Sequence, residues 1–171
     1  MILKFAGFLI VFCACAMAGL LKAGSLQKRV RELEAFLSVL ALIANEIRYY
    51  AAPTAEILEK LDGSPEFHGL RLFGDCLNRL RETRDISTAW TAALKAAAPG
   101  LALDEGDLEA LAWFGAVLGS TDAQGQLANC ERYTALLAQR LESARQDQAR
   151  RGRMYTSLGM LTGVFFCVLF L

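Results

Sequence analysis

The sequence predicts an all-α fold: an antiparallel six-helix bundle flanked by N- and C-terminal transmembrane helices. Through the middle of the chain, apolar residues recur at alternating spacings of three and four, which is typical of one face of an α-helix. Charged residues are confined to the same part of the chain. All 18 acidic residues lie within residues 22–153, and Lys4 is the only one of the 18 basic residues that lies outside this range. No stretch alternates apolar and polar residues as a strand would.

The distribution of charge divides the chain into an N-terminal anchor at residues 1–21, a helical bundle at residues 22–153 and a C-terminal anchor at residues 154–171. The C-terminal segment has no charge and extends roughly 27 Å at ~1.5 Å per residue, close to the thickness of a bilayer's hydrocarbon core. A cleaved signal peptide is the alternative at the N-terminus, because Ala14-Cys15-Ala16 has the form of a cleavage site. The apolar run continues to Leu21, which favours a retained anchor.

Basic residues gather at the inner ends of both predicted anchors. They are Lys22, Lys28, Arg29 and Arg31 after the first anchor and Arg145, Arg150, Arg151 and Arg153 before the second. Because basic residues close to a membrane span remain in the cytoplasm, we expect the bundle to be cytoplasmic and both termini to face away from it. The predicted location is therefore the cell membrane, with the bulk of the chain in the cytoplasm.

The first bundle helix is predicted to begin near Leu26 as a continuation of the N-terminal anchor, with Gly24-Ser25 as a candidate break or kink between them. Pro53 ends it, because proline has no amide hydrogen and restricts the preceding residue. A short second helix follows at residues 54–61. The residues expected to face inward are Val30, Leu33, Phe36, Leu37, Leu40, Ile43, Ala44, Ile47, Tyr50 and Ala51 on the first helix and Ile57, Leu58 and Leu61 on the second.

The third helix is predicted to start at Ser64-Pro65, with the serine as N-cap, and to continue to Arg81. Ser87 is the expected N-cap of the fourth helix, which ends before Pro99-Gly100. The expected inward residues are Phe67, Leu70, Phe73, Leu77 and Leu80 on the third helix and Ala89, Trp90, Ala93 and Leu94 on the fourth.

Asp104 is the expected N-cap of a fifth helix at residues 105–118. The acidic run from Asp104 to Glu109 has two interpretations: ordinary capping charge at the positive end of the helix dipole, or a contact patch for a basic partner. A sixth helix at residues 122–153 is predicted to be the antiparallel neighbour of the first. The expected inward residues are Leu108, Leu111, Ala112 and Val117 on the fifth helix and Leu127, Cys130, Thr134, Leu137, Leu141 and Ala144 on the sixth.

The sequence offers no set of catalytic residues. It has no GxxxxGK phosphate loop and no GxSxG elbow, and its single histidine, His68, is expected to be a surface or packing residue. None of its five cysteines forms a CxxC or a metal-ligand spacing, so Cys76 and Cys130 are expected to be reduced thiols on helix faces. The near-neutral bundle has no basic footprint for nucleic acid. We therefore expect no enzyme activity, no cofactor and no metal.

Binding to other proteins remains, and two groups of residues are candidate partner contacts. The first group lies at the end of the first helix and consists of Glu46, Arg48 and Pro53, and the second is the loop made of Gly119, Ser120, Thr121 and Asp122. Glu46 is expected either to pair with a neighbouring helix or to point toward a partner. In the second anchor, Gly159 and Gly163 form a GxxxG motif, which lets another transmembrane helix approach closely.

Three motifs resemble the stage III sporulation protein AB family of endospore-forming bacteria. They are Glu46-Ile47 with Tyr49 and Pro53 before the helix at 56–61, Leu118-Gly119-Ser120-Thr121-Asp122 with Gln126, and Gly152-Arg153-Met154-Tyr155 before Leu158-Gly159 and Gly163. The resemblance covers the whole chain, including both anchors.

That family is similar to the cytoplasmic domains of the type II secretion F-type platform proteins, which sit in the inner membrane above a hexameric secretion ATPase. The resemblance implies a component of the channel complex between mother cell and forespore, in the mother-cell membrane, with a secretion-type ATPase and other membrane proteins of the channel as partners. Secretion platform proteins usually carry two such domains, so a homo-oligomer would supply here what a second domain supplies there. The alternative is a static membrane scaffold or receptor that transmits no force.

Overall fold

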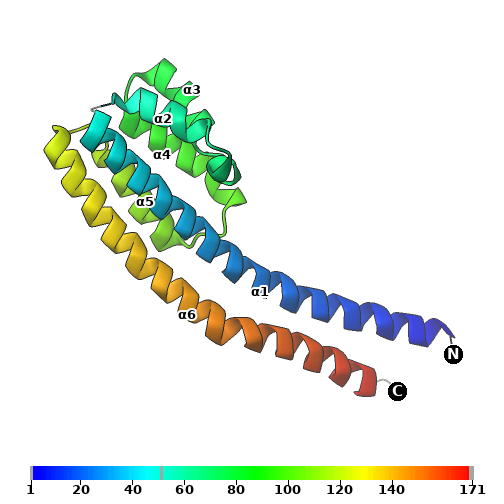
Figure 1. Ribbon diagram of the computed structural model, residues 1–171. Coiled ribbons are helices and arrows are strands. Elements are labelled where there is room, and N and C mark those ends of the chain that lie inside the picture. Colours follow the sequence, from blue (N-terminus) through cyan, green and yellow to red (C-terminus); the bar gives the residue numbers. More distant parts are fainter. Residues whose placement is uncertain (1, 51, 170–171) are drawn as a thin grey trace. The chain divides into compact units, whose positions relative to one another are not determined.

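All regular structure in the described residues is helical (Figure 1), as the sequence predicts. The computed structural model describes the backbone of residues 2–50 and 52–169, and the side chains of residues 14, 17–50, 52–151, 154, 157 and 161. The α-helices are α1 (Ile2–Asn45), α2 (Thr54–Asp62), α3 (Phe73–Thr83), α4 (Ile86–Ala97), α5 (Glu105–Val117) and α6 (Ala123–Leu169). Three short elements join them: the π-helix η1 (Glu46–Tyr50) and the 3₁₀ helices η2 (Pro65–Leu70) and η3 (Ala98–Gly100).

The chain divides into two compact units. Unit 1 consists of residues 1–30 and 143–171, and unit 2 of residues 31–142. Unit 1 contains both predicted anchors, but most of their side chains, including those at the GxxxG motif, lie outside the described residues. Within the described part, no helix offers an apolar stretch long enough to cross a membrane. The two transmembrane helices therefore stay a prediction.

Of the two alternatives at Gly24-Ser25, the break does not occur, because α1 passes through both residues without interruption. The hydroxyl of Ser25 donates a hydrogen bond to the carbonyl oxygen of Lys22 at 2.8 Å, back along its own helix. A Cβ atom at Gly24 would meet nothing within 4 Å. A single glycine costs a helix about 1 kcal/mol relative to alanine, which is too little to end a long helix that continues on both sides.

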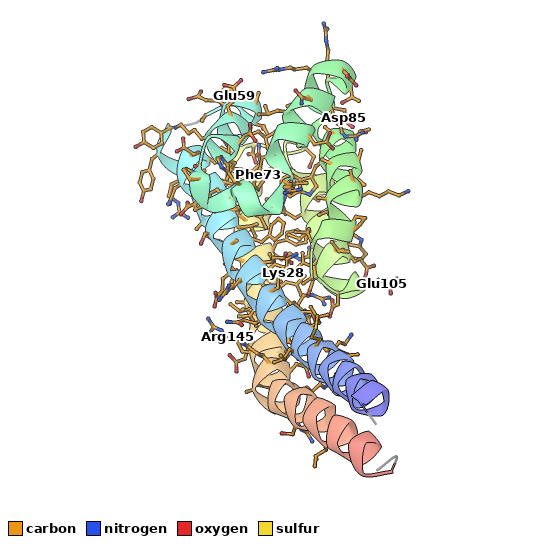
Figure 2. The ribbon with its side chains drawn as sticks, turned by 90° about the vertical axis from the view of Figure 1, so that its right-hand side faces the viewer. Lys28, Glu59, Phe73, Asp85, Glu105 and Arg145 are labelled. Atoms are coloured by element: carbon orange, nitrogen blue, oxygen red, sulfur yellow. The ribbon has the colours of Figure 1, made fainter. Side chains whose placement is uncertain are left out.

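In unit 2, α1 and α6 run side by side in opposite directions in both views (Figures 1 and 2), as predicted. Their buried faces follow a three-four spacing, but on α6 Tyr133 is buried, whereas the predicted Leu127 and Thr134 are only half-buried. Val30, which closes unit 1, is also buried. The buried apolar residues of unit 2 on these elements are Leu33, Phe36, Val39, Leu40, Ile43 and Ile47 on α1 and η1 and Cys130, Tyr133, Leu137 and Leu141 on α6. The stripe on α1 is turned slightly from the prediction, since Val39 is buried while Leu37 and Ala44 are half-buried.

The predicted single helix from Ser64 to Arg81 is wrong. The chain instead forms η2, turns at Arg71 with a left-handed φ of 50°, and begins α3 at Phe73. Leu70 and Leu72 are both buried. On one continuous helix these two residues would point about 200° apart, so the left-handed turn is what allows both to reach the core. Figure 2 shows Phe73 inside unit 2 and Glu59 and Asp85 at its surface.

The fourth helix begins earlier than predicted. Its N-cap is Asp85 rather than Ser87, and the Asp85 carboxylate accepts hydrogen bonds from the amide of Thr88 at 3.0 Å and from the Thr88 hydroxyl. These bonds lower the pKa of Asp85. The left-handed Arg84, with a φ of 55°, ends α3 just before this cap, so α3 and α4 are joined by the shortest connection in unit 2.

Aromatic rings form a continuous row through the core of unit 2. Ring centroids lie 6.2 Å apart between Phe67 and Phe73, 6.2 Å between Phe73 and Trp90, 5.7 Å between Trp90 and Phe114, and 5.6 Å between Phe114 and Tyr133. Three of these pairs are edge-to-face and the Phe73–Trp90 pair is tilted, and edge-to-face pairs each contribute about 0.5–1.5 kcal/mol beyond the area they bury. The row links η2, α3, α4, α5 and α6, and the predicted inward residues of α2 and α4 are buried around it.

The inward face of α5 differs from the prediction. Leu111 is buried as expected, but Leu108, Ala112 and Val117 are only half-buried, and the core is filled by Ala110, Phe114 and Gly115. The indole of Trp90 lies directly over Gly115 and donates a hydrogen bond to the Leu111 carbonyl oxygen at 2.9 Å. This contact, which joins α4 to α5, sets the rotation of α5.

Candidate partner-binding site

The end of α1 carries a single π-turn in front of a proline. After Asn45 the chain continues as η1, and the amide of Ala52 donates to the carbonyl oxygen of Glu46 at 3.4 Å. A π-turn contains about one more residue than an α-turn, so it rotates the residues that follow it relative to the buried stripe of α1. The prediction that Tyr50 faces inward is therefore wrong: Tyr49 and Tyr50 are both 71% exposed.

Of the two alternatives for Glu46, pairing with a neighbouring helix or pointing toward a partner, the structure shows the first. The ammonium group of Lys60 on α2 lies 2.6 Å from the Glu46 carboxylate and 5.1 Å from the centre of the Tyr50 ring. The hydrogen bond to Glu46 raises the pKa of Lys60. Glu46 is only 12% exposed, so this pair ties the π-turn to α2. The position of the Tyr50 ring is held by the same cation.

Arg48 also pairs within the protein. Its guanidinium lies 3.4 Å from the carboxylate of Glu131 on α6, and both side chains are well exposed. Exposed ion pairs contribute about 0–1 kcal/mol, so this contact adds little stability.

The loop Gly119–Asp122 lies against the starts of α2 and α4. Gly119 has a φ of 75°, a conformation that side chains other than glycine rarely adopt. A Cβ atom there would lie 3.0 Å from a methyl group of Ile86 and 3.8 Å from the hydroxyl of Thr54. Because Thr54 follows Pro53, the structure places this loop beside the turn at Pro53.

Hydrogen bonds within the chain occupy the polar groups of this loop. Asp122 accepts from the amide of Gly125 at 2.9 Å at the start of α6, and the Ser120 hydroxyl donates to the Val117 carbonyl oxygen at 2.8 Å. The side-chain amide of Gln126 donates to the carbonyl oxygen of Thr121 at 3.0 Å. Asp122 and Gln126 therefore stabilise the loop and the start of α6 through these hydrogen bonds. Residues Gly119 to Asp122 are nevertheless all exposed.

Both predicted groups of partner contacts thus lie at one end of unit 2, opposite the points where the chain enters and leaves it. We call this the tyrosine end and define it as Glu46–Tyr50, Pro53-Thr54, Ile86 and Gly119–Asp122. The sequence indicated its polar residues but not the two exposed tyrosines. One available signal was their adjacency, since neighbouring residues on a helix point about 100° apart and cannot both face a narrow core.

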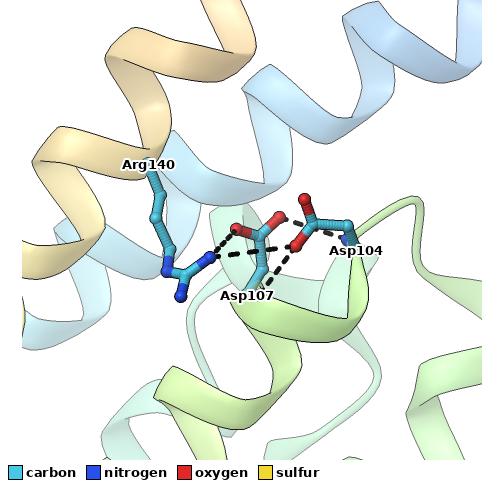
Figure 3. Close-up of polar contacts among 3 residues, drawn as sticks. All are labelled: Asp104, Asp107 and Arg140. Carbon is cyan, nitrogen blue, oxygen red and sulfur yellow. Dashed lines mark hydrogen bonds and ion pairs between the residues drawn. The ribbon is translucent and has the colours of Figure 1, made fainter.

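The acidic run on α5 is largely explained by capping. Asp104 and Asp107 form a reciprocal capping box, with each carboxylate accepting from the other's amide, at 2.8 Å and 3.1 Å. The Asp107 side chain is fully buried and lies 3.6 Å from the guanidinium of Arg140 on α6, which also lies 4.0 Å from Asp104 (Figure 3). Gly106 leaves room for this guanidinium, since a Cβ atom there would lie 2.5 Å from one of its nitrogens.

No catalytic centre is assembled from the side chains that the structure describes. His68 is exposed, and its Nε2 lies 3.1 Å from the carbonyl oxygen of Asp62, in agreement with a surface or packing role. Cys76 and Cys130 are free and buried as predicted, and burial raises their thiol pKa values to about 12 and about 11. Within the described part, no group of three or more metal-ligating side chains comes together.

A family model now places this helical unit among known proteins. The model of stage III sporulation protein AB matches residues 4–171. The chain belongs to the stage III sporulation protein AB family. The stage III sporulation protein AB of Bacillus subtilis (strain 168) is 26% identical to it over 170 residues, which cover 98% of each chain. Membership assigns a role in sporulation, and this is not a known enzyme family.

A solved structure has the same fold. It is that of a stage III sporulation protein AB, which matches with a TM-score of 0.63 and 24% sequence identity and covers 72% of this chain and 98% of the solved one. The family motifs quoted from the sequence have structural roles here. Gly119 provides the left-handed turn, Asp122 and Gln126 close the loop, and Glu46 holds the π-turn to α2.

Proposed function

We propose that this chain is a non-enzymatic platform component of the membrane complex between mother cell and forespore, and that it couples a cytoplasmic secretion-type ATPase to that complex. The observation that carries the proposal is the tyrosine end. It presents two adjacent tyrosines, each 71% exposed, beside an exposed loop. Exposed tyrosines are among the commonest anchors of protein interfaces, because they offer a large apolar area and lose little conformational entropy on binding.

Attachment to the membrane through unit 1 is the second part of the proposal. Met17, Leu20 and Leu21 are 60%, 56% and 70% exposed and lie on one face of α1 at helical spacing. On α6, Leu161 is 68% exposed. Large apolar side chains exposed together are typical of a surface that meets lipid or another protein, and the basic residues beside them suit a membrane surface.

The packing within unit 2 would allow a displacement at the tyrosine end to be transmitted to α1 and α6. Glu46 ties η1 to α2, and the aromatic row joins η2, α3, α4, α5 and α6 in one packed core. Close-packed interiors transmit displacement with little loss because they are hardly compressible. A partner that pushes on η1 would therefore move α1 and α6 together.

Replacement of both tyrosines tests the partner contact. In sporulating cells, the Y49S/Y50S variant of the full chain should recover about tenfold less ATPase by co-purification than the wild type, because it lacks both rings. The Y49F/Y50F variant is the matched control, since it keeps the rings and should retain the ATPase. Equal recovery of ATPase with Y49S/Y50S and with wild type would reject the tyrosine end as the contact.

An engineered thiol tests the membrane topology. Cys76 and Cys130 are buried, so a reporter cysteine is placed at Thr91, which is exposed on α4. We expect a membrane-impermeant thiol reagent to label T91C only after the cells are permeabilised. Labelling in intact cells would place the bundle outside the cytoplasm and exclude the ATPase as a direct partner.

Turnover by the ATPase distinguishes coupling from a static scaffold. With an ATPase variant that binds but does not hydrolyse ATP, coupling predicts that the complex still assembles and that sporulation fails. A scaffold that transmits no force predicts that sporulation proceeds as long as the complex assembles.

A further inference from the structure

Trp113 on α5 is an exposed aromatic residue with no structural partner in the described part of the chain. Its side chain is 59% exposed, whereas the other tryptophan, Trp90, is fully buried and hydrogen-bonded. No ring contact or cation–π contact involves Trp113 among the described residues. Exposure of an indole to water is unfavourable because of its large apolar area, and tryptophan is enriched at protein interfaces.

Trp113 belongs to one face of α5. Glu105, Glu109 and Trp113 follow each other at spacings of four, so they form a single row, and Ala112 and Ala116 lie beside it. We call these five residues the Trp113 face. The two alanines are small enough to let another helix approach closely. Figure 2 shows Glu105 at the outer edge of α5, pointing away from unit 2.

The two glutamates of this face are not used by the fold. The capping box and the buried ion pair employ Asp104 and Asp107, and no ion pair involves Glu105 or Glu109 within the described residues. The acidic run therefore divides into two parts, of which one caps α5 and the other is free beside an exposed indole.

We propose that the Trp113 face binds a basic amphipathic helix of a partner protein. A carboxylate at Glu109 and an indole one turn later can hold one guanidinium or ammonium group between them, by an ion pair on one side and a cation–π contact on the other. Apolar side chains of the same partner helix would cover Trp113, Ala112 and Ala116. This site is separate from the tyrosine end and does not depend on the function proposed for it.

Two other occupants fit this face less well. The sequence of α5 contains no lysine, arginine or histidine, so two copies of the chain that met through this face would bring carboxylates together without a cation. An anionic lipid surface would likewise be repelled by Glu105 and Glu109. The free carboxylates thus select a cationic protein segment.

Site-specific photocrosslinking tests the proposal in cells that make the full chain. The photoreactive residue p-benzoylphenylalanine replaces Trp113, and the same residue at Thr91, exposed on α4, is the control position. We expect an adduct at position 113 with a yield about tenfold above that at position 91. Its cross-linked peptide, identified by mass spectrometry, should carry lysine or arginine at helical spacing with apolar residues between them.

Charge variants decide whether the carboxylates take part. In the position-113 background, E105Q/E109Q and E105K/E109K should each reduce the adduct about tenfold or more. The glutamine variant keeps the shape of both side chains and therefore controls for damage to the helix start. E66K/E82K changes the net charge by the same amount as E105K/E109K, at exposed positions on η2 and α3, and should leave the adduct unchanged.

Any of three results would overturn the proposal. The first is a cross-linking yield at position 113 that is no higher than at position 91. The second is an adduct with a second copy of this chain or with a peptide that has no basic residues, and the third is an adduct that persists in both charge variants. Co-purification of the ATPase should be the same in E105Q/E109Q as in the wild type. This readout keeps a failure of the Trp113 face distinct from a failure of the tyrosine end.

Discussion

Replacement of Gly115 by alanine should strongly destabilise unit 2, although Gly115 lies within a helix where alanine is normally preferred. A Cβ atom at this position would lie 1.9 Å from Cδ1 of Trp90, 2.4 Å from its Cγ and 2.6 Å from its Nε1. Trp90 has no free space, because it is fully buried and its ring centroid lies 6.2 Å and 5.7 Å from those of Phe73 and Phe114.

The size of the effect follows from three contributions. Overpacking of a close-packed core costs about 1–3 kcal/mol, and a contact of 1.9 Å calls for the upper value. Displacement of the indole also breaks the 2.9 Å hydrogen bond from Trp90 to Leu111, a buried bond worth about 1 kcal/mol. The higher helix propensity of alanine returns about 1 kcal/mol. The net loss is about 3 kcal/mol, a large part of the ~5–15 kcal/mol that stabilises a typical domain.

Urea unfolding of the full chain in detergent micelles measures this loss. Substitution of Trp113 by phenylalanine in both proteins leaves Trp90 as the only tryptophan, so its fluorescence reports the core of unit 2. With a slope of about 2 kcal/mol per molar urea, a loss of 3 kcal/mol lowers the midpoint by about 1.5 M. Gly100→Ala is the control, because a Cβ atom there meets nothing within 4 Å. If Gly115→Ala and Gly100→Ala unfold at the same urea concentration, the contact with Trp90 does not set the packing of α5.

Three further predictions concern charges and thiols of unit 2. Arg140→Ala should lower the free energy of unfolding by about 2 kcal/mol in the same urea assay, because it removes the guanidinium 3.6 Å from the buried carboxylate of Asp107. Asp85→Ala should lower the thermal midpoint of unfolding at pH 7. The pKa of Asp85 in the folded protein lies below its unfolded value of ~3.9. The cap therefore stabilises the protein above about pH 4, and this stabilisation is lost as the pH falls through the folded pKa. Because burial raises the thiol pKa of Cys76 to about 12 and of Cys130 to about 11, maleimide at pH 7.5 should label both at least about a hundredfold more slowly in the folded protein than in urea, as mapped by mass spectrometry.

Each of these predictions has a result that would contradict it. An unchanged urea midpoint for Arg140→Ala would mean that the ion pair with Arg140 is not needed to stabilise the buried Asp107 carboxylate. A difference between wild type and Asp85→Ala that is as large at pH 2.5 as at pH 7 would separate the cap's effect from its charge. Labelling of Cys76 at equal rates with and without urea would show that α3 opens readily.

The sequence alone determined most of the residues that enter helices and, for α2 and α4, all of the residues that enter the core; on α6 it missed Tyr133. This succeeded because a helix that buries one face repeats its apolar residues every three to four positions, and the repeat is visible without knowledge of the neighbours. Asp104 as N-cap and Pro53 as a helix stop were equally local decisions, since each depends on backbone groups a few residues away. The family resemblance was also carried by local motifs.

Tertiary packing decided what depends on neighbours distant in the sequence. The left-handed turn at Arg71 exists because Leu70 and Leu72 both reach the core, and the rotation of α5 is set by an indole from α4 over Gly115. The capping box of Asp104 and Asp107 is local, but the ion pair that Arg140 on α6 forms with these aspartates is not visible in the sequence of α5. Exposure of Tyr49, Tyr50 and Trp113 is likewise a property of how helices meet, since an apolar side chain is left in water only where no second element of the chain covers it.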